Sequence, residues 1–493
     1  MAGLLIALCA LSLAYYGNFG KFHVLPVYGP LNFHEAEVYT YYSGSKYFKE
    51  TGYYDLYNCT SVGIREIKAE HPEQATPDLF AIMNLRDKKS YLSPEQVWSQ
   101  YGPQCHQRFS PKRWDSFKKD LRVFLNAGSY SSWWRTSLSD AGYNSSPVFA
   151  AFAGTIANLL PIDRLWRGSG YIDFLLVAIA AFFIYRAFGF YPLMAFLLIF
   201  GTNELSSYRW TGGSFFRQAW FASLTVALCL LKQKKYFWSG VIFAYSAGDR
   251  VIPLLFFAGA LVPLSYQWVQ SKGEKREIIS FAVGFAISLG VWFLLSVSLY
   301  DLGHWRDFFA NMKVHNRPFH IPHVGLKKAM IYFKGISPQD FWYEEGLKRF
   351  NVWNAALEKV LQSRRIFYYP LALFLILGSL WVSRKKSPPL AALLVGGSLL
   401  YALLLPARYY YVYLALFPVV SYEFPSTFHN NIRLFLSFFL VFALLVIPML
   451  PPDDIVLNIY FSYALGIFFS LQILTAAFEE CVSLRDKGLN RVS

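Results

Sequence analysis

The chain has 493 residues, of which 55% are hydrophobic, 19% are aromatic and only 16% are charged. A soluble protein usually has about a quarter of its residues charged, so this composition excludes an ordinary soluble globular protein. The formal charge of +15 would suggest nucleic acid in a soluble chain, but much of the basic excess lies in short turns between apolar segments, so we expect no nucleic-acid partner.

Long apolar segments recur along the chain, and an α-helix needs about 20 mostly apolar residues to cross a bilayer. Strands of a membrane barrel would show short alternating segments, which the sequence lacks. We therefore predict an all-α polytopic membrane protein with about 12–13 transmembrane helices. The candidate spans lie near residues 1–16, 147–160, 171–189, 190–204, 214–231, 236–248, 251–269, 278–299, 367–383, 389–405, 408–423, 432–449 and 455–477.

The basic turns predict how these spans are oriented, because Lys and Arg concentrate in cytoplasmic loops. KQKK (232–235), KGEKR (272–276) and RKK (384–386) are therefore expected inside, together with the basic C-terminal tail. The two polar segments, residues 17–146 and 300–366, are then expected on the non-cytoplasmic side. With both segments on that side, the number of membrane crossings is right only if one candidate span between residues 147 and 213 does not cross fully. The predicted regions are a first helix (1–16), an external loop domain (17–146), a transmembrane core (147–299), a second external loop (300–366) and C-terminal helices with the tail (367–493).

The external loop domain contains a predicted amphipathic helix, KRWDSFKKDLRVFLNA (112–127). Its apolar residues recur at helical spacing and its lysines and arginines lie on the opposite face. Such a helix either lies flat on a membrane surface or packs on its own domain, and the sequence allows both. The domain also contains two of the five cysteines, Cys59 and Cys105. They would form a disulfide in an oxidising compartment, or remain as two unrelated thiols.

Two carboxylates follow the first span closely, in NFHEAEVYTYYSGSKYF (32–48). Asn32 and Glu35 have the spacing of a capping box, which predicts a helix start near Phe33 and a structural role for Glu35. Glu37 has no such role and lies about 200° around the helix from Glu35, on the face of Tyr41. A carboxylate in this position could act as a general base toward a hydroxyl. The alternative is a solvated surface glutamate.

Two arginines lie in apolar surroundings: Arg217 in GGSFFRQAWF and Arg408 in LLLPARYYYVYL. An arginine at membrane depth usually has a partner, and a helix start favours anions. Both are candidates to bind a phosphate, against the alternatives of snorkelling to headgroups or a structural ion pair. The adjacent Asp249 and Arg250, at a break in an apolar segment, are interpreted as structural.

Several blocks resemble the C-type glycosyltransferase superfamily, in a bacterial branch similar to polyprenol-dependent mannosyltransferases. The resemblance covers roughly residues 1–300, and E-A-E stands where many members have an aspartate or an acidic pair. It implies a multipass enzyme of the bacterial inner membrane that takes a sugar from a polyprenyl-phosphate carrier and transfers it with inversion. The blocks are HEAEVYTYYSGSKYF, KKDLRVFL, DAGYNSSPVF, GGSFFRQAWFASLTVALCLLK and DRVIPLLFF.

That mechanism suggests roles for particular residues. Glu37 would be the catalytic base with Glu35 as the second candidate, and His34 would orient the carboxylate or contact the acceptor. Positive charge must stabilise the departing phosphate, which assigns Arg217 and Arg408 to the donor. Polar residues of DAGYNSSPVF could bind the acceptor, although the same residues also make an ordinary turn before a helix. These acceptor candidates are Asp140, Tyr143 and Asn144.

We assign no metal ligands, and the one cofactor that the sequence leaves open is a divalent cation, Mg²⁺ or Mn²⁺. Three histidines of the second loop, His315, His320 and His323, have spacings interrupted by prolines, which does not suit a zinc site. Mg²⁺ or Mn²⁺ would need clustered carboxylates, which only Glu35 and Glu37 offer. The leading interpretation is thus a membrane glycosyltransferase acting on a polyprenyl-phosphate sugar among membrane lipids. The alternative is a non-catalytic multipass subunit that has the same scaffold and binds other membrane protein subunits.

Overall fold

The computed structural model describes residues 2–25, 29–31, 33–74, 76–127, 138–270, 275–315, 321–331, 346–422, 427–450 and 454–489. Helices dominate these residues, as predicted. The strands among them form two small antiparallel hairpins, β1 (His23–Leu25) with β2 (Gly29–Leu31) and β3 (Ile82–Met83) with β4 (Tyr91–Leu92).

Helix α1 (Ala2–Tyr16) precedes the loop domain, which we define as residues 17–146, and packs on α11 (Phe190–Thr202). The helical elements of the loop domain are α2 (Glu35–Val38), a π-helical turn (Tyr39–Ser43), α3 (Gly44–Lys46), α4 (Phe48–Thr51), α5 (Leu56–Glu70), α6 (Pro94–Arg108) and α7 (Pro111–Ala127). After it come α9 (Pro147–Leu159), α10 (Ile162–Phe188), α12 (Tyr208–Thr211), α13 (Ala219–Lys232), α14 (Tyr236–Asp249), α15 (Pro253–Gln270), α16 (Lys275–Tyr300) and α17 (Gly303–His315). The C-terminal part contains α18 (Leu326–Met330), α19 (Gly346–Ser363), α20 (Arg365–Ser383), α21 (Pro388–Leu403), a 3-10 helix (Arg408–Leu416), α22 (Phe417–Ser421), α23 (Phe428–Val446) and α24 (Asp454–Leu489).

Five helical segments in the described part of the chain are long and apolar enough to cross a membrane, which supports the prediction of a membrane protein. They are Gly168–Phe188, Lys275–Tyr300, Arg365–Ser383, Phe428–Met449 and Asp454–Val482. Several other predicted spans, including α9 and α11, are apolar helices shorter than that length. The total of 12–13 crossings therefore stays a prediction.

Two predicted spans differ from the structure in form. The span expected at 214–231 becomes helical only at Ala219, because a glycine turn precedes it. The span expected at 408–423 is a 3-10 helix followed by the short helix α22. The α-helix begins only at Phe417, and Pro418 stands in its first turn, where the missing N–H of proline is tolerated.

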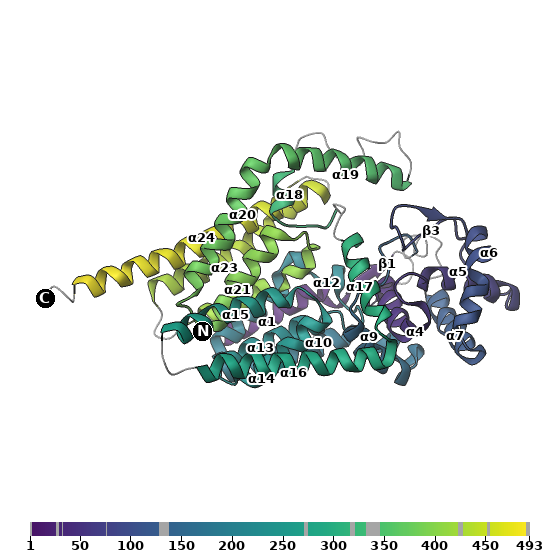
Figure 1. The fold of residues 1–493 in the computed structure, drawn as a ribbon, viewed down its shortest axis with the longest axis horizontal. Coiled ribbons are helices and arrows are strands. Elements are labelled where there is room, and N and C mark those ends of the chain that lie inside the picture. The colour runs from purple at the N-terminus through teal and green to yellow at the C-terminus, as the bar shows by residue number, and fades with distance from the viewer. Residues whose placement is uncertain are drawn as a thin grey trace.

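The molecule is elongated, with the loop domain at one end and the C-terminus of α24 at the other (Figure 1). Helices α14 and α16 run side by side along it. The two helices approach closely because each has a glycine at the point where they cross. A Cβ on Gly240 would lie 2.1 Å from the Phe281 carbonyl oxygen, and a Cβ on Gly284 would lie 2.2 Å from that of Phe237. Small residues are what permit such close packing in membrane helices.

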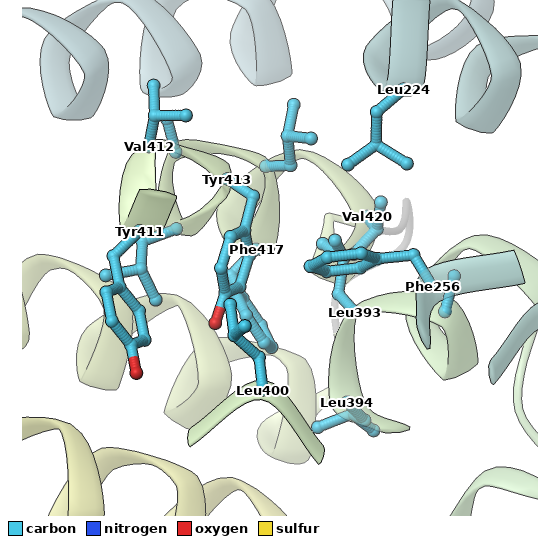
Figure 2. Packing of buried hydrophobic residues seen from close by; sticks show 14 of the residues in the cluster. Leu224, Phe256, Leu393, Leu394, Leu400, Tyr411, Val412, Tyr413, Phe417 and Val420 are labelled. Atoms are coloured by element: carbon cyan, nitrogen blue, oxygen red, sulfur yellow. The ribbon is translucent and has the colours of Figure 1, made fainter. Parts of the chain in front are cut away.

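The membrane core joins the middle of the chain to its C-terminal part. Leu224 of α13 and Phe256 of α15 pack with Tyr413 of the 3-10 helix and Phe417 of α22 (Figure 2). Phe256 and Tyr413 meet edge to face, with ring centroids 4.8 Å apart. This packing anchors the 3-10 helix, whose first residues lead into the site described below.

The loop domain packs around a second core, which it shares with α9, the start of α10 and Phe215. Trp114, Phe117, Leu121 and Phe124 of α7 are all buried there, so this helix packs on its domain, which was one of the two interpretations that the sequence allowed. A disulfide between Cys59 and Cys105 joins α5 to α6. A buried ion pair of 2.7 Å between Lys46 and Asp120 joins α3 to α7. The loop domain is therefore a folded platform that holds α2 in place.

Candidate functional site

The acidic motif begins a helix two residues later than predicted. Helix α2 starts at Glu35, and the residue that caps it is His34, whose Nδ1 accepts from the Glu37 backbone N–H at 3.4 Å. The predicted start near Phe33 is therefore wrong, because His34 is still in an extended conformation. Asn32, the predicted cap, lies outside the described residues. The capping role assigned to Asn32 thus belongs to His34, and Glu35 is the first residue of the helix.

Glu37 forms an ion pair with Arg217, which lies just before α13. The Arg217 side chain is buried at 7% exposure, whereas that of Glu37 is 24% exposed. The same guanidinium donates to the hydroxyl of Tyr409 and lies 4.9 Å from the ring centroid of Tyr41. In this ion pair the arginine is therefore buried, whereas the carboxylate is partly exposed.

A second buried arginine, Arg250, lies against the same tyrosine. Its guanidinium is 5.3 Å from the Tyr41 ring centroid, and its Nη1 donates to Ser145 Oγ at 2.5 Å. Its Nη2 and the Nε of Arg217 have no hydrogen-bond partner among the residues that the structure describes. Sequence reasoning treated Arg250 as structural. Its charge at the break in an apolar segment was the signal that could have identified it, because buried charge in a membrane protein is often functional.

The predicted acceptor residues lie around the same point. The Tyr41 hydroxyl donates to Asn144 Oδ1 at 3.0 Å. Asp140 is exposed, accepts from Tyr57 and from the Gly142 N–H, and interacts electrostatically with Glu37. Tyr143 is different: it is 1% exposed and shares a hydrogen bond of 3.1 Å with Ser45.

Three predicted residues, Glu37, Asn144 and Arg217, thus converge directly around Tyr41, and Asp140 lies nearby. Tyr143 also packs against Tyr41, with ring centroids 6.0 Å apart, but its side chain is buried.

Arg408 lies elsewhere. It is 1% exposed, and its guanidinium stacks 3.5 Å from the ring centroid of Trp210 in α12. Its guanidinium nitrogens have no hydrogen-bond partner among the described residues. No contact between Arg408 and the Glu37–Arg217 pair is found in the described part of the chain. The structure therefore places the two predicted phosphate ligands in different environments.

Glu35 lies in a different environment from that of Glu37. It is 6% exposed, and its Oε1 is buried without a hydrogen-bond partner among the described residues. Burial raises the pKa of Glu35 to about 7. A carboxyl group with such a pKa can exchange a proton near neutral pH. Glu35 makes no described ion pair with Arg217 or Arg250, so it belongs to a separate acidic position.

Histidines and carboxylates do not gather into a metal site in the described part of the chain, where no group of three or more metal-ligating side chains is found. His320 lies outside the described residues. His323 is buried at 7% exposure and pairs with Ala407 through a β-bridge. Glu35 and Glu37 face different surroundings, so they do not form the paired site that a divalent cation would need.

Comparisons of this chain with protein-family models, with curated proteins and with solved structures each found no match. The chemistry must therefore be argued from the geometry. Two buried guanidinium groups with spare N–H donors can bind an anion such as a phosphate. A partly exposed carboxylate beside them can accept a proton.

Proposed function

We propose that the protein is a membrane glycosyltransferase that transfers a sugar from a polyprenyl-phosphate donor to a hydroxyl of an acceptor. The observation that carries this proposal is the pairing of a partly exposed carboxylate, Glu37, with a buried arginine, Arg217. The C-type glycosyltransferase fold, suggested by the sequence resemblance, belongs to the same proposal. The site combines the two functions that the reaction needs, an anion-binding group and a base.

The donor phosphate would bind at Arg217 and Arg250. Both side chains are buried, both retain donors, and they lie on the same tyrosine ring. Hydrogen bonds between an arginine and a phosphate are charge-assisted and often bidentate. Arg250 replaces Arg408 as the second phosphate ligand in this proposal, because Arg408 stacks on Trp210 and makes no contact with the pair among the described residues.

Binding of the donor would also release the base. A carboxylate held by a guanidinium has its lone pairs engaged, so Glu37 is restrained in the structure. A phosphate that takes the Arg217 donors competes with Glu37 and frees it. The exchange couples the two events: the carboxylate becomes available only when the donor is present, which limits reaction without the donor.

The transfer step follows from these positions. Glu37 removes the proton from the acceptor hydroxyl, and the oxygen attacks the anomeric carbon opposite the phosphate. The new C–O bond forms as the bond to the phosphate oxygen breaks, with inversion. The electron pair leaves on the phosphate, where Arg217 and Arg250 stabilise its charge. Asn144 and Asp140 are near enough to Glu37 and Tyr41 to hydrogen-bond the acceptor.

The same proposal includes the orientation in the membrane. The loop domain and residues 300–366 would lie on the non-cytoplasmic side of a bacterial inner membrane, with about 12–13 crossings in total. The disulfide between Cys59 and Cys105 supports this side for the loop domain, since disulfides persist in oxidising compartments.

Transfer by the purified protein in lipid nanodiscs, with a panel of polyprenyl-phosphate sugars, tests the function. Glu37→Gln should lower the rate by about 10²–10⁴-fold, the usual contribution of a general base. Glu95→Gln, at an exposed glutamate of the same domain, is the matched control and should transfer normally. Equal rates for wild type and Glu37→Gln would remove Glu37 from the mechanism. A wild type inactive with every donor would favour the non-catalytic subunit.

A further inference from the structure

Helix α10 contains a carboxylate that the proposed reaction does not use. Asp173 is 1% exposed and lies within the candidate span Gly168–Phe188. A carboxylate within a membrane span is energetically costly and usually has a functional partner. Its Oδ2 accepts from the Gly213 backbone N–H at 2.7 Å. The partner is therefore a turn of the backbone.

Two further contacts, made by residues near the N-terminus, hold the same turn. His23 Nε2 donates to the Gly212 carbonyl oxygen at 2.9 Å, and the His34 backbone N–H donates to the Gly213 carbonyl oxygen at 3.3 Å. Burial lowers the pKa of His23 to about 4, so its ring is neutral at pH 7. The carbonyl acceptor then requires the ring proton on Nε2. Asp173 and the N-terminal residues His23 and His34 thus converge on two adjacent glycines that are distant from them in sequence.

The turn needs such support because its backbone is strained. Gly213 has a φ of +67°, and Phe215 and Phe216 have φ values of +45° and +60°. Bulky residues rarely adopt positive φ, and such strain persists only where surrounding contacts hold it. A Cβ on Gly212 would lie 2.2 Å from Tyr208 Cγ, so a glycine is required there too.

The turn leads directly to Arg217. The Arg217 backbone N–H donates to the Ser214 carbonyl oxygen at 3.3 Å, which ties its position to the strained residues. Its side chain then reaches Glu37, while Asp173 interacts electrostatically with the same guanidinium. Arg217 therefore lies between two carboxylates, one that can exchange for a phosphate and one that is fixed to the turn.

We propose that Asp173 is a positioning residue for the anion site: together with His23 it clamps the Gly212–Gly213 turn and so holds Arg217 where a lipid phosphate binds. This inference rests on the proposed function for its ligand, whereas the clamp itself is a statement about the turn.

Binding of polyprenyl phosphate to the full-length protein in nanodiscs tests the role toward the ligand. Asp173→Ala should weaken binding by about 10-fold or more, the loss expected for a hydrogen bond to a charged group. Asp173→Asn retains an oxygen that accepts from Gly213 and should stay within about threefold of wild type. Asp163→Asn, at an exposed position of the same helix, is the control. Wild-type binding by Asp173→Ala would overturn the proposal.

A double-mutant cycle separates positioning from general stability. If Asp173 acts through Arg217, its substitution should have little further effect on binding in an Arg217→Lys background. Additive losses would contradict the proposal. If Asp173→Ala does not fold, His23→Phe removes the other side-chain contact of the clamp and should show the same non-additivity.

Hydrogen exchange of residues 208–218 makes the test independent of the ligand. Asp173→Ala should exchange its Gly213 amide faster by 10-fold or more, whereas Asp173→Asn should not. This result would stand even if the wild type bound no polyprenyl phosphate, in which case only the proposed function would fail. Unchanged exchange in Asp173→Ala would show that the clamp does not exist.

Discussion

Arg217 and Arg408 occupy similar places in the sequence and different places in the molecule. Each is an isolated cation beside an apolar helix and a set of aromatic residues. Arg217 pairs with the carboxylate of Glu37 and with a tyrosine hydroxyl, whereas Arg408 stacks on the ring of Trp210. The first is an ion pair with a partly exposed carboxylate, and the second is a buried cation–π contact. Burial of an arginine alone therefore does not identify an anion site.

The difference arises from which segment covers each guanidinium. The loop domain supplies Glu37 and Tyr41 to Arg217. The short helix α12 supplies Trp210 to Arg408. A folded platform outside the membrane core is therefore what distinguishes the two positions, and the predictions below disturb one position or the other.

Removing the disulfide disturbs the platform and has the largest expected effect. The Cys59–Cys105 bond spans 46 residues, and closing such a loop is worth about 4 kcal/mol in the chain-entropy model. The double variant Cys59→Ser/Cys105→Ser should lower the stability of the loop domain by about that amount and weaken phosphate binding at Arg217. Denaturant unfolding followed by hydrogen exchange measures it. Equal loss of protection around Trp210 would show that the two positions are not independent.

The pH dependence of stability separates Glu35 from the Arg217 pair. Burial raises the pKa of Glu35 from 4.5 to about 7, so the folded state binds more protons than the unfolded state between these pH values. Its stabilising effect is complete below about pH 4.5 and is lost as the pH rises through about 7, by about 3 kcal/mol. Glu35→Gln should reduce the fall by about 3 kcal/mol in thermal unfolding scans from pH 4 to 8, and the remaining fall includes that of Asp140, whose pKa burial raises to about 6. The same fall in the variant would assign it to another group.

Replacing each arginine by lysine tests the comparison itself. Lysine keeps the charge and loses the planar set of donors. Arg217→Lys should weaken polyprenyl-phosphate binding by about 10–100-fold, whereas Arg408→Lys should change it by less than about threefold. Titration of nanodisc-embedded protein measures both. A larger effect at Arg408 would move the anion site to Trp210.

Trp210→Leu has the smallest expected effect and addresses Arg408 alone. Loss of a desolvated cation–π contact costs about 2 kcal/mol, so the variant should unfold at a lower temperature. Phosphate binding at Arg217 should not change. Reduced binding with unchanged stability would show that Trp210 belongs to the ligand site.

The sequence predicted most of the helices and few of the contacts. Apolar segments mark α10, α16, α20 and α24 because the length of a span is a local property. The contact of Arg250 with Tyr41 was not predicted, because it depends on packing between the loop domain and the end of α14, whereas its ion pair with Asp249 fits the structural role that was predicted. The start of α2 was displaced by the extended conformation of His34, whose backbone bonds to Gly213, a residue distant in sequence.

The exchange of Glu37 for a phosphate at Arg217 is the central claim, and polyprenyl-phosphate affinity of Glu37→Gln tests it most directly. A neutral glutamine competes less for the guanidinium, so the variant should bind the lipid phosphate about threefold to tenfold more tightly than wild type, while its transfer rate falls by about 10²–10⁴-fold. Weaker or equal binding would contradict the claim, since it would mean that Glu37 and the phosphate do not share Arg217.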